Sequence, residues 1–273
     1  MRADGKLVKG KESMYYLIPH FLPKRYDAMN MVTVDVPVAP MREYMNAKRR
    51  EGRAVSHLAL VLTAYAHMLK EFPEINNFVV NKRIYAHNDF TVSMVVLRPS
   101  GESAMSKIII DYDDDVFTVQ KKITDFIETN RSTVEKNGLD KAMDVFVKMG
   151  FLTRIAINLA RFCDKYGLLP KALIDVSPFH ASLLISDLAS IRANHIYHHV
   201  YEFGTTSVAI TMGNLREVPK HTKDGIVFER CIPLGVVMDE RICSGHYFAY
   251  AFERFQKYLK KPELLENRDA VKA

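Results

Sequence analysis

The alternation of apolar and polar residues predicts strands and helices interspersed along the whole chain. Period-two stretches rich in β-branched residues predict strands at 31–38, 78–80, 83–86, 90–97, 104–111, 180–186, 207–212 and 226–238. Apolar residues at helical spacing predict helices at 40–52, 58–72, 116–127, 139–166 and 245–261. Such an order is typical of an α/β or α+β protein in which helices cover a mixed sheet.

Turn and end signals refine this pattern. Asn81 and Lys82 between two short strands predict a tight hairpin, and Ser56 is a good N-cap for the helix that follows it. The polar stretch 216–225 predicts a loop, and the charged residues 1–12 predict a loosely ordered start. For the long helical region at 139–166 we prefer packing on the domain over contact with a membrane surface or a partner.

Length and composition limit the class of protein. A chain of 273 residues fits one large domain, so we expect residues 1–273 to form a single one. The net charge of +6 favours an anionic partner, yet no aromatic RNA-binding motif or Cys/His finger indicates nucleic acid. Three cysteines stand far apart, which favours the reducing cytoplasm, and no apolar run predicts a signal peptide or a membrane span.

One motif follows the last predicted strand and opens the last predicted helix. Asp239, Arg241 and Gly245 match the D-H-R-x-x-D-G corner that ends a strand in dihydrolipoamide acyltransferase cores. The corner also resembles H-H-x-x-x-D-G of chloramphenicol acetyltransferase. In this alignment Glu240 stands at the catalytic histidine and Ser244 at the following aspartate.

Upstream segments extend the resemblance over roughly residues 31–266. The stretch 180–191 is similar to the F-T-I-S-N-L-G segment of the acyltransferase cores and places Ser186 at the hydroxyl that stabilises the oxyanion. Residues 71–76 resemble the K-x-x-P-x-x-N turn of the same family. Residues 137–175 look like a helical insertion relative to these cores.

The resemblance implies a chloramphenicol acetyltransferase-like fold, a two-layer sandwich with a mixed sheet covered by helices. It implies a homotrimer whose active site lies between subunits, one supplying the histidine position and its neighbour the serine. Coenzyme A or acyl-CoA would be the substrate, with a small-molecule or carrier-bound acceptor. The cofactor-binding residues stay unassigned, and a membrane surface is the less favoured partner.

Acyl transfer needs a base for the attacking group and donors for the oxyanion, so the candidate catalytic residues are Glu240, Ser186, His198 and His199. A glutamate is a weak base unless its surroundings raise its pKa, and Glu240 could equally be structural. His198 and His199, near His195, could supply a displaced base, and their spacing does not indicate zinc. The prediction is a coenzyme A-dependent acyltransferase with a non-standard active site; the alternative is an inactive protein that binds or scaffolds.

Overall fold

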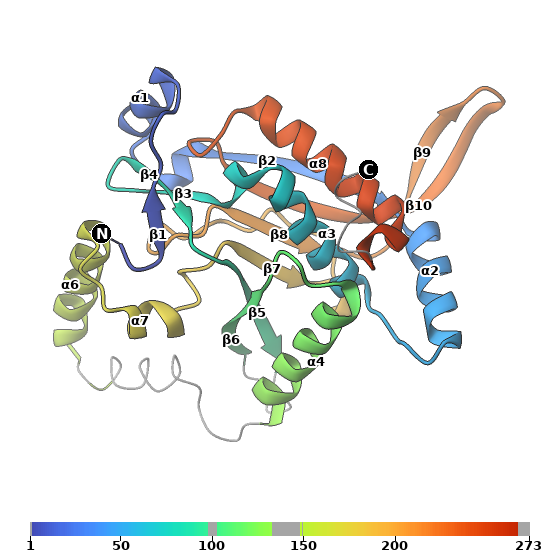
Figure 1. Cartoon of the computed structure of the whole chain (residues 1–273), viewed down its shortest axis with the longest axis horizontal. Coiled ribbons are helices and arrows are strands. Elements are labelled where there is room, and N and C mark those ends of the chain that lie inside the picture. The colour runs from blue at the N-terminus through green and yellow to red at the C-terminus, as the bar shows by residue number, and fades with distance from the viewer. Residues whose placement is uncertain (1, 98–102, 133–147, 149, 267–273) are drawn as a thin grey trace.

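The computed structural model describes residues 2–97, 103–132, 148 and 150–266, and its centre is a large mixed sheet (Figure 1). The strands run in the order β2-β10-β8-β7-β5-β6, with β9 paired to the outer half of β10. Pairs β5–β7 and β7–β8 are parallel and the others are antiparallel. The strands are β2 (Met29–Pro37), β5 (Phe90–Leu97), β6 (Ser103–Ile110), β7 (Leu183–Asp187), β8 (Val208–Met212), β9 (Arg216–Thr222) and β10 (Gly225–Asp239).

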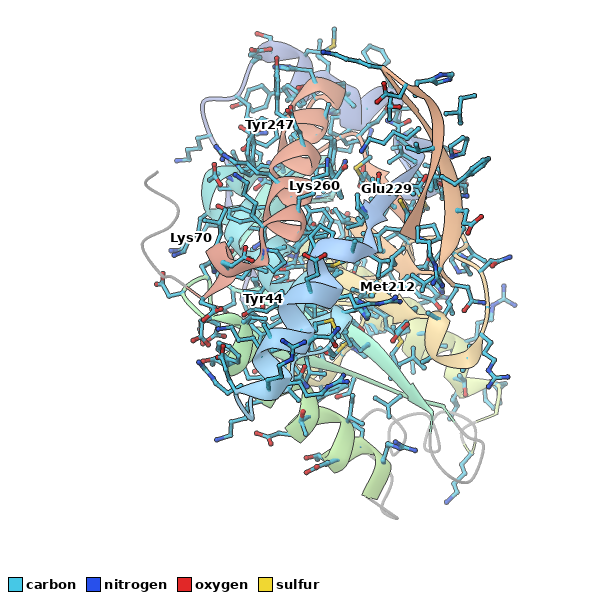
Figure 2. All side chains as sticks on the ribbon, turned by 90° about the vertical axis from the view of Figure 1, so that its right-hand side faces the viewer. Tyr44, Lys70, Met212, Glu229, Tyr247 and Lys260 are labelled. Atoms are coloured by element: carbon cyan, nitrogen blue, oxygen red, sulfur yellow. The ribbon has the colours of Figure 1, made fainter. Side chains whose placement is uncertain are left out.

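Helices cover one face of this sheet. They are α2 (Val38–Arg50), α3 (His57–Glu71), α4 (Val116–Ser132) and α8 (Gly245–Lys260). Alternate strand residues such as Ile185, Ile210 and Val236 point into the core beneath them. Their neighbours Leu184, Ala209 and Val237 form a smaller cluster on the other face. In Figure 2, Tyr247 and Lys260 mark α8, and Glu229 marks the β9–β10 hairpin. The expected α/β class with a mixed, helix-covered sheet is therefore confirmed.

A second, three-stranded sheet is built from β1 (Gly5–Leu7), β4 (Arg83–His87) and β3 (Asn77–Val80), in that order. The predicted hairpin between β3 and β4 is present. Asn81 and Lys82 have φ values of 49° and 61°, the left-handed conformation that a two-residue turn between twisted strands requires. Ser56 accepts a hydrogen bond from the backbone N–H of Ala59 and so caps α3, as predicted.

Two local predictions were wrong, and one helix was missed. Residues 5–7 are not loose but pair with β4, and the Arg2 side chain before them is buried against Asp4 and Asp164. Residues 216–222 are not a loop but the strand β9, because they pair along β10 over their whole length. The helix α1 (Ser13–Phe21) was not predicted. In each case the backbone pairs or packs with a segment that local pattern does not reveal.

Of the helix predicted at 139–166, the structure describes residues 148 and 150–166, and α6 (Leu152–Tyr166) accounts for most of them, after a turn at 150–151. Gly167 ends α6 in the left-handed conformation, and a further short helix, α7 (Lys171–Val176), follows beyond the predicted one. Residues 137–147 and 149 of the predicted helix and insertion lie outside the described residues. Among the helices that the structure describes, none combines the length and apolarity needed to cross a bilayer.

Acid is expected to destabilise the fold through His87 on β4. Burial lowers the pKa of His87 to about 4, and its Nε2 donates to the Thr205 carbonyl at 3.3 Å. An unfolded chain takes up a proton at His87 near its ordinary pKa of 6.5, whereas the folded chain resists it until about 4. The free energy of unfolding should therefore fall as the pH drops through this window, by about 1–3 kcal/mol from this residue.

Urea unfolding at several pH values tests this expectation. His87→Gln should flatten the pH dependence, because glutamine can still donate to the carbonyl but does not titrate. His221→Gln, on the exposed strand β9, is the matched control and should leave the dependence unchanged. Equal curves for all three proteins would contradict the role given to His87.

Candidate functional site

The corner between β10 and α8 is built on a buried ion pair. Asp239, the last residue of β10, is fully buried and accepts from Arg241 Nε at 2.8 Å and Nη2 at 2.7 Å. The backbone N–H of Arg241 also donates to this carboxylate at 3.2 Å. Two of the three residues that matched the acyltransferase corner thus bind each other, and they fix the course of the chain on both sides of Glu240.

Arg25 completes the corner from a distant part of the sequence. Its Nε lies 3.6 Å from Asp239 Oδ2, and its other nitrogens donate to the carbonyls of Tyr201, Gly204 and Val79 at 2.5 to 3.2 Å. Burial lowers the pKa of Arg25, an effect that the Asp239 carboxylate opposes. Sequence reasoning missed Arg25, because its partners are 54 or more residues away and no local pattern marks it.

Glu240 itself is half-buried and held by neutral groups. Its backbone N–H donates to the Ala28 carbonyl at 2.9 Å, and Asn30 Nδ2 on β2 donates to Glu240 Oε2 at 2.7 Å. Among the described residues, no lysine, arginine or histidine forms an ion pair with it. Asn30 is a second site residue that the sequence did not reveal. The Glu240 carboxylate is thus oriented through one oxygen, while its charge is not neutralised.

The remaining residues of the corner are structural. Ser244 is the N-cap of α8 and accepts from the Tyr247 N–H at 3.2 Å, so it takes the capping role rather than that of an ion-pairing aspartate. Cys243 is buried, and burial raises the pKa of its thiol, which keeps it protonated and unreactive. Within the corner, Glu240 is therefore the residue available for chemistry.

Ser186 lies near the carboxyl end of β7, far from Glu240 of the same chain. It is in register with Thr211 on β8, which is in register with Gly235 on β10. Glu240 is five residues beyond Gly235, which is about 17 Å along an extended strand. Ser186 and Glu240 thus stand toward opposite ends of the sheet, and one copy of the chain does not bring them together.

The histidine segment, residues 195–199, crosses the sheet face that the helices leave free, between Ser186 and Glu240. Ile196 exchanges hydrogen bonds with Thr211 Oγ1, at 3.1 Å from its N–H and 2.5 Å to its carbonyl, which places the segment beside the strand position of Ser186. His195 Nε2 lies 3.1 Å from Thr33 Oγ1. His198 Nδ1 contacts the His199 carbonyl at 2.8 Å, and His199 is exposed.

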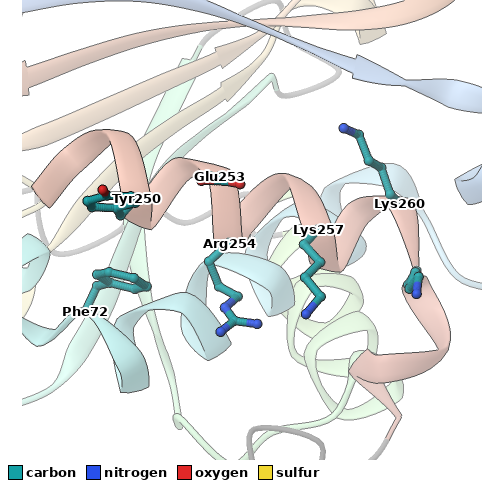
Figure 3. A pocket seen from close by; sticks show the side chains of 7 residues that line it. Phe72, Tyr250, Glu253, Arg254, Lys257 and Lys260 are labelled. Atoms are coloured by element: carbon teal, nitrogen blue, oxygen red, sulfur yellow. The ribbon is translucent and has the colours of Figure 1, made fainter. Parts of the chain in front are cut away.

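Two hollows border the site elements. A groove of about 530 Å³ lies at the carboxyl end of β7, lined by apolar residues including Met94, Phe126 and Ile185, with Asp187 and Ser190 at its polar side. A second, of about 580 Å³, runs along α8 and carries several cations (Figure 3). In the part of the chain that the structure describes, no group of three or more His, Cys, Asp or Glu side chains could hold a metal ion.

Comparison with known proteins gives no sequence relative but several structural ones. No family model matches the chain, and no curated protein matches it. A probable dihydrolipoamide acetyltransferase of Listeria monocytogenes is similar with a TM-score of 0.61 and 14% identity, over 94% of this chain and 95% of that one. The dihydrolipoamide acetyltransferase of Azotobacter vinelandii has a TM-score of 0.62 at 13% identity, over 95% and 94%.

Chloramphenicol acetyltransferase is also similar, with a TM-score of 0.54 and 12% identity over 93% of this chain and 99% of its own. Both kinds of enzyme that the sequence resembles therefore share the arrangement of strands and helices found here. At these identities the likeness concerns the fold. This chain has the fold of the dihydrolipoamide acetyltransferase and chloramphenicol acetyltransferase superfamily.

Proposed function

We propose that this protein is a coenzyme A-dependent acyltransferase with a non-standard active site, in which Glu240 is the base. The observation that carries the proposal is the state of Glu240. It stands on an intact Asp239–Arg241 corner, at the position that the sequence resemblance assigns to the histidine, is oriented by Asn30, and has no cationic partner among the described residues. A purely structural glutamate at this position would be expected to pair with a cation.

In the proposed reaction the Glu240 carboxylate takes a proton from the attacking group of the acceptor. The acceptor then forms a bond to the thioester carbonyl carbon, and the oxyanion is stabilised by the Ser186 hydroxyl. Collapse of this intermediate breaks the carbon–sulfur bond, and the coenzyme A thiolate takes the proton back from Glu240. Among the described residues the Ser186 hydroxyl has no hydrogen-bond partner, which leaves it available to donate.

The distance between Ser186 and Glu240 within one chain supports a site shared between copies. In a homotrimer, Glu240 of one subunit can face Ser186 of the next, so that the two residues meet although they are far apart within one chain. The A. vinelandii enzyme supports these positions, because a serine, a histidine and an asparagine were investigated in its catalytic mechanism. In this chain a serine, a glutamate and a serine would take those places, at Ser186, Glu240 and Ser244.

The same reaction could use a histidine in place of Glu240 as the base, and the geometry supports one candidate. His198 Nδ1 must donate to the His199 carbonyl, because a carbonyl only accepts, and Nε2 of the neutral ring is then left with its lone pair free. His199 is exposed, and although its ring contacts those of His198 and Tyr201, neither ring nitrogen forms a hydrogen bond among the described residues. His198 is thus the stronger of the two histidine candidates.

The test is acyl transfer from acetyl-CoA and longer acyl-CoAs to thiol, hydroxyl and amine acceptors. With Glu240 as base, Glu240→Gln should lower kcat/KM by about 10²- to 10⁴-fold, because glutamine cannot accept the proton. Glu240→His should retain transfer and move its pH optimum toward neutrality. His198→Ala is the comparison variant. If His198→Ala abolishes transfer and Glu240→Gln does not, the base is the histidine.

Mixing two inactive variants tests the shared site. Glu240→Gln and Ser186→Ala subunits are each expected to be inactive alone. When they are unfolded and reassembled together, about one interface in four receives an intact Glu240 and an intact Ser186. Recovery of about a quarter of the activity supports a site between copies, and no recovery contradicts it.

One observation favours a second candidate, an inactive protein that binds coenzyme A or serves as a scaffold. Ser244 caps α8 and forms no ion pair at the aspartate position. Calorimetry separates the two functions, because tight coenzyme A binding without turnover would favour the scaffold. The predicted cytoplasmic location belongs with either function.

A further inference from the structure

Helix α6 presents an apolar stripe to solvent. Ile155, Leu159, Phe162 and Tyr166 recur at helical spacing, and their exposed fractions are 59%, 60%, 54% and 52%. Soluble surfaces rarely place four large apolar side chains in one such row without a partner. We therefore expect a partner to cover this stripe.

The helix is fixed to the body by its opposite side, so the stripe is not a product of a loose segment. Asp164 is buried and accepts from Arg2 Nη2 at 2.6 Å, and His180 Nε2 lies 3.3 Å from it. Its pKa falls to about 2, because Arg2 and His180 stabilise the carboxylate against the cost of burial. Asp164 is thus already paired inside the protein. The other charged residues of α6 include three cations that pair with no acid among the described residues: Arg154, Arg161 and Lys165.

A cationic groove begins at the edge of α6. It has a volume of about 450 Å³, and Lys24, Lys82, Arg161 and Lys165 line it together with Phe162. Two other charged groups of the lining, Asp164 and Arg241, are already neutralised by buried partners. Among the described residues of the lining Glu202 is the one remaining acid, so four cations face one carboxylate there.

A second apolar helix reaches the other side of this groove. The exposed residues Met14, Leu17 and Phe21 share one face of α1, and His20 of the same helix contacts Lys82 of the groove at 3.4 Å. Figure 1 places α1 and α6 along the same side of the molecule, with the small sheet between them. Cations are thus bordered on both sides by exposed apolar helix faces.

We propose that α1, α6 and the groove between them bind the surface of a bilayer that contains anionic phospholipids. The apolar side chains of the two helices would enter the boundary between headgroups and acyl chains, while lysine and arginine side chains extend to the phosphates. An acidic protein would match the cations but would not need the two apolar rows, and a second copy would bring its own cations against these. The charge of the groove and the apolar rows together favour lipid.

Co-sedimentation of the full chain with vesicles tests the proposal and needs no acyl substrate, so it is independent of the proposed enzymatic activity. Binding is expected to vesicles of phosphatidylcholine with about a third phosphatidylserine, and to be much weaker to phosphatidylcholine alone. Ile155→Ser with Leu159→Ser should abolish binding. Ile157→Ser, an exposed residue of α6 off the stripe, is the matched control and should bind like the wild type.

Removal of cations tests the groove separately. Arg161→Ala with Lys165→Ala should weaken binding to the anionic vesicles by about fivefold for each charge removed. The matched control is Lys257→Ala with Lys260→Ala, which removes two cations from α8 in the hollow of Figure 3 and should leave binding unchanged. Equal losses in both pairs would show attraction by net charge alone and overturn the assignment to this groove.

A fluorescent reporter places the stripe in the bilayer. The chain has no tryptophan, so Phe162→Trp provides a single probe on α6, and Tyr250→Trp, at an exposed position of α8, provides its control. Anionic vesicles should shift the emission of the first to shorter wavelength and leave the second unchanged. Absence of vesicle binding would overturn the proposal. It would also be overturned if the protein self-associated instead of binding vesicles and the Ile155→Ser, Leu159→Ser variant abolished that self-association.

Discussion

Asp239→Asn is expected to lower the free energy of unfolding by about 3–5 kcal/mol, because it leaves two buried guanidinium groups without a counter-charge. Asp239 is fully buried and binds Arg241 through two hydrogen bonds, with Arg25 Nε at 3.6 Å. Urea unfolding followed by circular dichroism measures the change. The variant should also lose any acyl transfer, since the corner that carries Glu240 would shift.

A matched control exists on the surface. Asp35 accepts two hydrogen bonds from Arg216, at 2.9 and 2.7 Å, in the same paired geometry but partly exposed to solvent. Asp35→Asn should therefore cost at most about 1 kcal/mol, because water screens the pair and solvates what remains. Similar losses in the two variants would contradict the account of Asp239 as a buried anchor.

Gly204→Ala is expected to destabilise the protein by about 3 kcal/mol or more and to displace the histidine segment. Gly204 has a φ of +91°, and a Cβ there would lie 2.1 Å from the Phe179 carbonyl oxygen. That oxygen already accepts from the Thr205 N–H at 2.9 Å, so it cannot move without losing a hydrogen bond. The loss of stability therefore has two additive sources, the strained backbone conformation of a non-glycine residue and the clash with the Phe179 backbone.

Gly225→Ala separates these two causes. Gly225 has a φ of +119°, but a Cβ there would meet no atom within 4 Å. Its cost should therefore be limited to backbone strain, about 1–2 kcal/mol. Thermal unfolding of both variants gives the comparison, and equal losses would mean that the contact with Phe179 contributes nothing.

The stability of the corner and its chemistry have different sources. Asp239, Arg241 and Arg25 form a closed, buried set whose loss should unfold the region. Glu240 is half-buried, and its contacts are one side-chain amide and one carbonyl. We therefore expect Glu240→Gln to change activity with little effect on stability, which is the behaviour of a residue kept for chemistry.

Elements with a strong internal pattern could be predicted from sequence closely. The helix expected at 58–72 is α3 at His57–Glu71, and the one expected at 245–261 is α8 at Gly245–Lys260. The turn at Asn81 and Lys82 was also predicted, because side-chain and backbone preferences within a few residues decide it. Each of these elements presents an apolar stripe or a turn signal that needs no distant partner to be seen.

Elements that depend on a distant partner could not be predicted in this way. Strand β9 is exposed almost throughout and contains Pro219, so it shows no alternation, and pairing with β10 is what makes it a strand. Strand β1 depends likewise on β4. The domain boundaries and the predicted insertion stay predictions.

For the site, the sequence by itself determined the superfamily fold and the corner of Asp239, Glu240 and Arg241, because these residues are adjacent in the chain. Only the tertiary structure decided that Arg25 closes this corner, that Asn30 orients Glu240, and that Ser186 lies toward the far end of the sheet. The physical reason is strand register. Pairing between segments distant in sequence sets which side chains meet and how far apart the others stay.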